Sequence, residues 1–228
     1  MLKLLSIPFV KENIKSQLKK PDEGLGGFFT KYLLKNNESL EEVTARAIKP
    51  NPDENVLEIG FGRGDGLHYV LQNTLKNGNG FLYGVDHSKA TCKWAQNLMY
   101  KDVANGKLII LNEDVAKMSI ADGTINKVFH VHCCHFWPEM DNALSEIKRV
   151  MKPGGLVVSG ANLTLKKWGV GIGLTEEWMH DSTRYTDALQ RTGFVNINEE
   201  ITHDPVLEHD LLLIFAKKPD NHISKLKI

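Results

Sequence analysis

The stretch VLEIGFGRGDG, from Val56 to Gly66, joins a short apolar run to a loop in which four of seven residues are glycine. A near-continuous apolar run is typical of a parallel strand that is buried on both faces. The residues from Gly64 to Leu75 have the apolar spacing of a helix. The order strand, glycine loop, helix predicts a ligand-binding loop at the first strand of an α/β sheet.

The rest of the chain repeats this alternation. Further helices are predicted at Ser88–Ala104 with Ser88 as N-cap, from Met140 to Met151, and from about Thr175 to Arg191. Further strands are predicted at Gly80–Asp86, Lys107–Asn112, Asn126–His132 and Gly155–Gly160, and in FVNINEEI and LEHDLLLIFAK near the end of the chain. The pattern predicts a doubly wound, mostly parallel seven-stranded sheet, Rossmann-like, with helices on both faces and an antiparallel C-terminal hairpin.

The segment before the first strand has its own helical signals. The apolar spacing of Gly26–Asn36 predicts one helix, and the capping-box spacing of Ser39 and Glu42 opens a second helix that runs to about Ile48. We therefore predict an N-terminal helical entry or lid segment over 1–52, an α/β domain over 53–218 and a tail over 219–228.

Composition excludes some classes of protein. The 228 residues carry 28 Lys and Arg against 28 Asp and Glu, so no net charge recruits nucleic acid. We expect no secretory signal, because Lys3 and Pro8 interrupt the first apolar run, and no stable membrane insertion, because no segment reaches the ~20 apolar residues of a spanning helix. Three cysteines, two of them adjacent, indicate a reducing, cytoplasmic setting.

The spacing of the glycines discriminates between cofactors. A dinucleotide loop has the pattern G-x-G-x-x-G, in which the pyrophosphate rests on the helix N-terminus and the third glycine permits close packing. Gly60 and Gly62 fit this pattern, but Asp65 occupies the third position. Because its carboxylate would repel a pyrophosphate, NAD is disfavoured, and with it the hypothesis of a nicotinamide oxidoreductase.

The spacing Glu58-x-Gly60-x-Gly62-x-Gly64 resembles the first motif of the class I S-adenosylmethionine-dependent methyltransferases. The resemblance runs from about Gln17 to Lys217 and is greatest to the ubiquinone/menaquinone-biosynthesis-like (methyltransferase type 11) small-molecule branch. It implies S-adenosylmethionine as cofactor of the domain over 53–218. It also implies that Glu58 helps to hold the methionyl amine and that the three glycines let the backbone approach the cofactor.

Two further anchors follow from the same resemblance. Asp86, at the end of the second predicted strand, would accept the two ribose hydroxyls, and Asp114 would meet the adenine amine while Val115 packs on the ring. Each aspartate has a simpler alternative role, Asp86 as a helix cap and Asp114 in a surface turn. His132 is expected to line the cofactor site, because it directly follows the fourth predicted strand.

The residues after that strand are candidates for the acceptor site. Phe136, Trp137 and Trp178 are candidate substrate contacts, and core packing is the alternative for each. No catalytic residue is assigned, but a base for an acceptor that must lose a proton could come from a small set of side chains: His135, His180 and Tyr185. No metal is predicted, because the four possible ligands of His132–His135 are adjacent, whereas zinc ligands are usually separated by two or more residues.

We therefore predict an S-adenosylmethionine-dependent methyltransferase that acts on a small, largely apolar acceptor. The segment HVHCCHFWPE replaces the N/D-P-P-Y/F element of enzymes that methylate amino groups of bases or protein amides, so nucleic acid is not an expected partner. A protein or RNA methyltransferase and a non-catalytic cofactor-binding module with the same fold are the alternatives. No oligomeric state is assigned.

Overall fold

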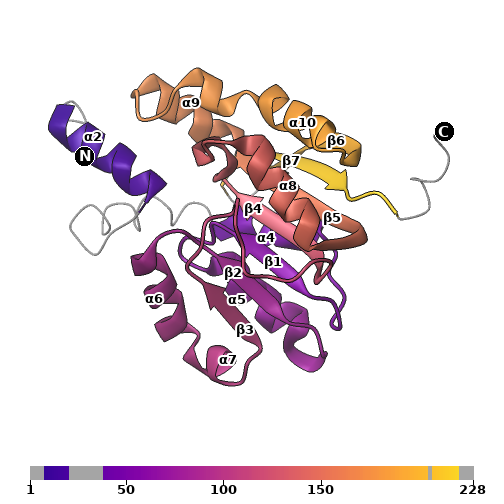
Figure 1. The fold of residues 1–228 in the computed structure, drawn as a ribbon. Coiled ribbons are helices and arrows are strands. Elements are labelled where there is room, and N and C mark those ends of the chain that lie inside the picture. The colour runs from indigo at the N-terminus through magenta and orange to yellow at the C-terminus, as the bar shows by residue number, and fades with distance from the viewer. Residues whose placement is uncertain (1–7, 21–37, 205–206, 221–228) are drawn as a thin grey trace, which may run out of the picture.

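A seven-stranded sheet forms the centre of the computed structural model, which describes residues 8–20, 38–204 and 207–220 (Figure 1). The strand order is β3-β2-β1-β4-β5-β7-β6, and β7 runs antiparallel to both of its neighbours while the other pairs are parallel. The predicted fold class is confirmed. The strands are β1 (Val56–Ile59), β2 (Leu82–Val85), β3 (Leu108–Leu111), β4 (Ile125–Val131), β5 (Met151–Asn162), β6 (Val195–Asp204) and β7 (His209–Lys217).

Helices cover both faces of the sheet, because successive strand residues point to opposite sides. Val56 belongs to a core with residues of α4, α5 and α6, whereas its neighbour Leu57 belongs to a second core with residues of α8 and α10. The helices are α2 (Pro8–Lys19), α4 (Glu38–Ala47), α5 (Asp65–Asn73), α6 (Lys89–Leu98), α7 (Tyr100–Ala104), α8 (Met140–Val150), α9 (Leu163–Gly171) and α10 (Ser182–Arg191), with 3₁₀ turns η2 (Leu75–Asn77), η3 (Cys134–Phe136) and η4 (Glu177–His180).

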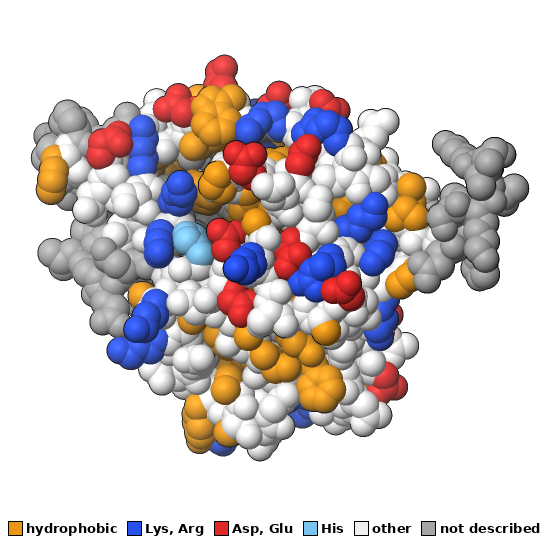
Figure 2. Space-filling model, in the orientation of Figure 1, with side chains coloured by type: hydrophobic (Ala, Val, Ile, Leu, Met, Phe, Trp, Pro, Cys, Tyr) orange, Lys and Arg blue, Asp and Glu red, His pale blue; other side chains and the backbone are white. Residues whose placement is uncertain are grey.

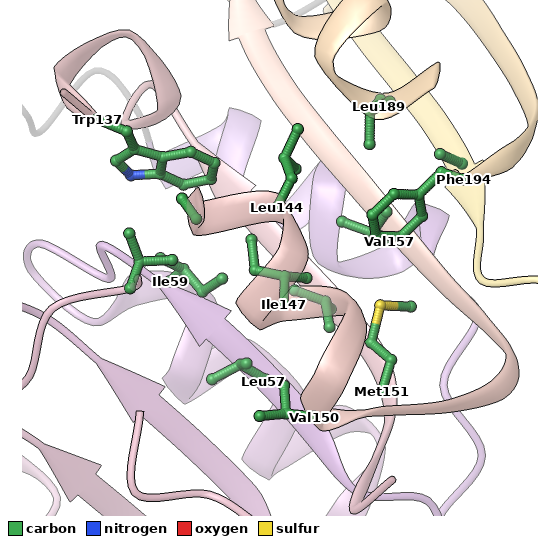
Figure 3. Packing of buried hydrophobic residues seen from close by; sticks show 14 of the residues in the cluster. Leu57, Ile59, Trp137, Leu144, Ile147, Val150, Met151, Val157, Leu189 and Phe194 are labelled. Carbon is green, nitrogen blue, oxygen red and sulfur yellow. The ribbon is translucent and has the colours of Figure 1, made fainter. Parts of the chain in front are cut away.

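Helix α8 shows how its sequence determines the packing. Leu144, Ile147 and Val150 recur at intervals of three residues, so they form one apolar face, and each is fully buried. Figure 3 shows this face between β1, β5 and α10, in contact with the core around Leu57 and Val157. Burial of each such side chain contributes about 1.5–3 kcal/mol to folding.

The start of α6 confirms a predicted cap. The Ser88 side chain accepts a hydrogen bond from the backbone N–H of Thr91 at 3.2 Å. The single helix predicted from Ser88 to Ala104 is nevertheless wrong, because Met99 has non-helical backbone angles (φ −110°, ψ 36°) and separates α6 from α7. The Met99 side chain is buried in the core beneath the break.

The region after β5 is more regular than predicted. The strand runs from Met151 to Asn162, longer than the predicted Gly155–Gly160, and Asn162 then caps α9 by accepting the backbone N–H of Leu165 at 2.9 Å. Glycine inside α9 hid this helix from the sequence pattern. A Cβ added at Gly169 would lie 2.8 Å from the Thr175 hydroxyl, so close packing requires glycine there. The predicted helix from Thr175 begins only at Ser182, as α10.

Two helices before β1 are described, and one of them was not predicted. No helix was predicted over the residues of α2. The predicted helix over Gly26–Asn36 lies outside the described residues. Helix α4 packs on α5, β4 and β5. It begins at Glu38, so Ser39 lies inside the helix rather than at the predicted cap, and its hydroxyl donates to Asp204. Across the described residues, each helix is too short or too polar to span a bilayer.

Candidate functional site

A cavity of about 340 Å³ opens at the carboxyl ends of β1, β2 and β4. The chain leaves β1 toward β2 on one side and returns beside it as β4 on the other, so the cavity lies at the switch point where ligands bind in such sheets. Figure 2 shows a hollow on this face, with hydrophobic side chains inside it and charged side chains around it. The predicted site residues that line the cavity are Gly60, Gly62, Asp86, Asp114, Val115, His132, Phe136 and Trp137.

The loop after β1 depends on glycine for its path. Gly60, Gly62 and Gly64 all have positive φ angles, of 66°, 50° and 83°. A Cβ added at Gly60 would also lie 2.9 Å from the Cβ of Cys133. Gly60 and Gly62 line the cavity, while Gly64 is the N-cap of α5. The loop therefore presents bare backbone to a ligand, and a side chain at Gly60 would disturb it.

Asp86 follows β2 and lines the same cavity. One carboxylate oxygen accepts the backbone N–H of Ser88 at 2.8 Å, and the other accepts that of Gly62 at 3.4 Å. Burial raises the pKa of this carboxyl, and the two N–H contacts lower it in part. Because an ionised carboxylate has about four acceptor sites, Asp86 retains the capacity to accept two hydroxyls. The cap of α6 is Ser88, not Asp86.

Asp114 and Val115 form another part of the wall. The Asp114 carboxylate accepts the backbone N–H of Ala116 at 2.8 Å, which is the turn geometry that aspartate favours. Val115 is nearly buried, at 9% exposure, and it packs in the core that also contains residues of α8 and α10. An aspartate in a tight turn next to a fixed aliphatic side chain suits a flat ring that carries a hydrogen-bond donor.

Two buried carboxyls lie beside the glycine loop, and only one of them was predicted. Glu58 in β1 is 1% exposed and does not line the cavity, whereas Glu41 of α4 does line it. Burial, reinforced by the charge of Asp65, raises the pKa of Glu41 to about 8. Glu41 lies three and four positions before the buried residues Thr44 and Ala45, so its place on the buried face of the helix could have been read from the sequence.

The segment after β4 turns back over the cavity. His132 has a positive φ of 51°, and its Nε2 accepts the backbone N–H of Asn162 at 3.1 Å. Phe136 and Trp137 follow and line the cavity. His135 is not among the lining residues, and its ring lies against that of Phe136 with centroids 4.1 Å apart. The described residues hold no group of three or more His, Cys, Asp or Glu that could bind a metal ion.

Tyr185 and Trp178 are not among the residues that line the cavity. Tyr185 is buried in the core, and its hydroxyl lies 2.8 Å from Nε2 of His130. Its position follows from α10, which packs its apolar face onto the sheet. Trp178 is half exposed, and the guanidinium of Arg184 lies over its ring at 4.7 Å. His180 is in η4, the same turn as Trp178.

The residues present fit a ligand with a diol, a flat ring and a positive charge. Asp86 can accept a diol, and Val115 offers an aliphatic surface to a ring. Glu41 places a carboxyl in the cavity wall, with the buried carboxyl of Glu58 behind the loop, and this suits a cationic donor. A pyrophosphate would meet carboxylates instead. S-adenosylmethionine has the diol, the ring and the charge, and it has no phosphate.

The fold and the cavity fit the class I S-adenosylmethionine-dependent methyltransferases. Residues 57–159 match the family described as a methyltransferase domain. This match over residues 57–159 agrees with the motif from Glu58 to Gly64 and with S-adenosylmethionine as the cofactor. The finer resemblance to the ubiquinone/menaquinone branch stays a prediction.

Several curated proteins and many solved structures are similar to this chain, and two of the curated proteins are described here. A hybrid PKS-NRPS synthetase of Macrophomina phaseolina is 22% identical over 196 residues, which is 77% of this chain and 5% of that protein. A 24-methylenesterol C-methyltransferase of Arabidopsis thaliana is 26% identical over 66% of this chain and 38% of its own length. The chain thus spans well under half of either relative.

A solved structure supports the fold over most of the chain. Phosphoethanolamine N-methyltransferase 2 of Haemonchus contortus, in complex with S-adenosylmethionine, superposes with a TM-score of 0.66. The sequences are 15% identical, and the match covers 91% of this chain and 60% of the other.

Proposed function

We propose that the protein is an enzyme that transfers the methyl group of S-adenosylmethionine to a small, largely apolar molecule. The observation that carries this proposal is a single cavity that holds both the cofactor anchors, Gly62 and Asp86, and the aromatic side chains of Phe136 and Trp137. Apolar and aromatic walls with a few placed polar groups are typical of small-molecule sites. Among similar proteins, the names of a sterol methyltransferase and a phosphoethanolamine methyltransferase refer to small molecules.

The protein's contribution to such a reaction is chiefly position. Bound S-adenosylmethionine supplies an electrophilic methyl group, and its thioether leaves without needing a proton. Asp86 and the backbone at Gly62 would hold the cofactor, while Phe136 and Trp137 would hold the acceptor in line and exclude water.

A base is needed only if the acceptor must lose a proton first. Nε2 of His132 already accepts a backbone hydrogen bond, so this ring would have to give up that contact to act as a base. The Tyr185 hydroxyl is paired with His130 inside the core. His135 and His180 therefore stay the candidates for this role.

Transfer of label tests the proposed function directly. The protein is incubated with S-adenosylmethionine carrying a ¹³C-methyl group and a fractionated metabolite extract, and mass spectrometry identifies the molecule that gains the label. Asp86→Asn is the matched control, since the asparagine keeps an acceptor for the Ser88 N–H but loses the charged acceptor for the ribose. Label that appears in RNA or protein and in no small molecule would refute the proposal. Cofactor binding without transfer to any fraction would favour the non-catalytic module.

A further inference from the structure

Helix α4 brings a buried carboxyl to the glycine loop. Oε2 of Glu41 accepts the backbone N–H of Gly66 at 2.9 Å, and Glu41 lines the cavity together with Gly60 and Gly62. Glu41 precedes the residues 57–159 that match the methyltransferase family. The resemblance that assigned Glu58 to the methionyl amine gave Glu41 no role.

Glu58 lies behind the same loop. A Cβ added at Gly66 would lie 2.7 Å from Oε1 of Glu58, so both glutamates converge on the first turn of α5. Glu58 is 1% exposed, and its Oε2 has no hydrogen-bond partner among the described residues. Burial, and then the charge of Glu41, raises the pKa of Glu58 well above its ordinary value. The pair is therefore costly to ionise without a cation.

Among the described residues, no lysine or arginine forms an ion pair with either glutamate, although the charge of Arg63 lowers the pKa of Glu41 and Lys19 lines the same cavity. Arg63, in the loop itself, has its Nε 3.3 Å from the carboxylate of Asp65. Within the described ranges, neither Glu41 nor Glu58 has a lysine or arginine within salt-bridge distance. A ligand with a positive charge would offset the negative charge of the pair, and its N–H donors would meet Glu41, the glutamate that lines the cavity. The ammonium group of the cofactor has three such donors, whereas its sulfonium group has none.

We propose that Glu41 contacts the α-ammonium group of the cofactor's methionine part, with Glu58 as a second negative charge behind it. Helix α4 is then part of the cofactor site, and Glu41 is a binding residue. This proposal rests on the assignment of S-adenosylmethionine as cofactor. It does not depend on which acceptor the enzyme methylates.

The test compares two ligands that differ only at the amine. S-adenosylhomocysteine, the demethylated product, and its analogue with hydrogen in place of the α-amino group are titrated calorimetrically into the wild type, Glu41→Gln and Glu42→Gln. Glutamine at position 41 keeps an acceptor for the Gly66 N–H, so the loop is retained. Glu42 is the next residue of the same helix and is the matched control, because it does not line the cavity.

Glu41→Gln should weaken S-adenosylhomocysteine about tenfold or more and leave the affinity for the analogue unchanged. Titrations at pH 7 in buffers of different ionisation enthalpy should show that the wild type releases up to about one proton with S-adenosylhomocysteine and none with the analogue. The proton count on the wild type shows whether a buried carboxyl ionises when the amine binds, and the Glu41→Gln titration assigns that carboxyl to Glu41 rather than Glu58.

Three results would overturn the proposal. Unchanged affinity of Glu41→Gln for S-adenosylhomocysteine would exclude the contact. Equal weakening of both ligands would mean that Glu41 only shapes the loop through Gly66. Failure of the wild type to bind S-adenosylhomocysteine would overturn the cofactor assignment itself, which the other two results would leave intact.

Discussion

Replacing Glu41 with glutamine should flatten the pH dependence of stability in the ligand-free protein. Burial raises the pKa of Glu41 from its ordinary value of 4.5 to about 8 in the folded state. A carboxyl with a raised folded pKa contributes stability that is fully present below the unfolded pKa. That stability is lost as the pH rises toward the folded pKa, because the folded state must release a proton that the unfolded state has already lost.

The charged groups around Glu41 act in the same direction, with one exception. The carboxyls of Asp65 and Glu38 raise its pKa, and Arg63 lowers it. Burial, and then the charge of Glu41, raises the pKa of Glu58, so Glu58 adds to the same loss of stability at high pH. With pKa values of 4.5 and about 8, Glu41 alone lowers the free energy of unfolding by about 2 kcal/mol between pH 6 and pH 8.

Urea unfolding at pH 6, 7 and 8, followed by tryptophan fluorescence, measures this loss. The free energy of unfolding of the wild type should fall by about 2 kcal/mol or more from pH 6 to pH 8, and that of Glu41→Gln should fall by less. Glu42→Gln should follow the wild type and serves as the control. If the wild type and Glu41→Gln respond to pH in the same way, the buried carboxyl does not govern the stability of the loop, and the electrostatic reasoning is wrong.

Three further substitutions test the site and the core. Asp86→Ala should weaken S-adenosylmethionine about tenfold or more in calorimetric titration, since two hydroxyls lose a charged acceptor; near wild-type affinity with a lowered melting temperature would reduce Asp86 to a support for the Ser88 N–H. Gly60→Ala should cost about 1–3 kcal/mol in urea unfolding, because a Cβ there combines a φ of 66° with a 2.9 Å approach to Cys133; a wild-type midpoint would contradict the assigned loop path. Leu144→Ala, at a fully buried position of α8, should cost about 2–5 kcal/mol in the same assay, and a loss below 1 kcal/mol would contradict the packing shown in Figure 3.

Features with local causes could be predicted from the sequence. The apolar run at Val56 and the glycines after it fix a strand and a turn within a few residues, and the serine cap of α6 depends on a contact between Ser88 and Thr91. Asp86 was predicted to lie at the site from the resemblance and from its position at the end of a strand, because the carboxyl ends of parallel strands meet at one edge. In each case the sequence neighbours supply the physical reason.

Features that depend on distant parts of the chain were missed. Glu41 meets the N–H of Gly66, 25 residues away, and only the assembled sheet brings the two together. Gly169 disfavours a helix by its residue type, and the reason for glycine there is its close contact with Thr175, which only the folded structure shows. Tyr185 was a candidate base on residue type alone, and its contact with His130 spans 55 residues.

The position of β7 has a consequence for the order of assembly. β6 precedes β7 in the chain but lies outside it in the sheet, so β5 gains its second neighbour only when residues 209–217 arrive. A chain still on the ribosome before that point exposes an unpaired edge along β5, which is a template for aggregation. Because β6 pairs with β7 and not with β5, β6 can join the sheet only together with β7 or after it, so the last strand of the chain completes the sheet.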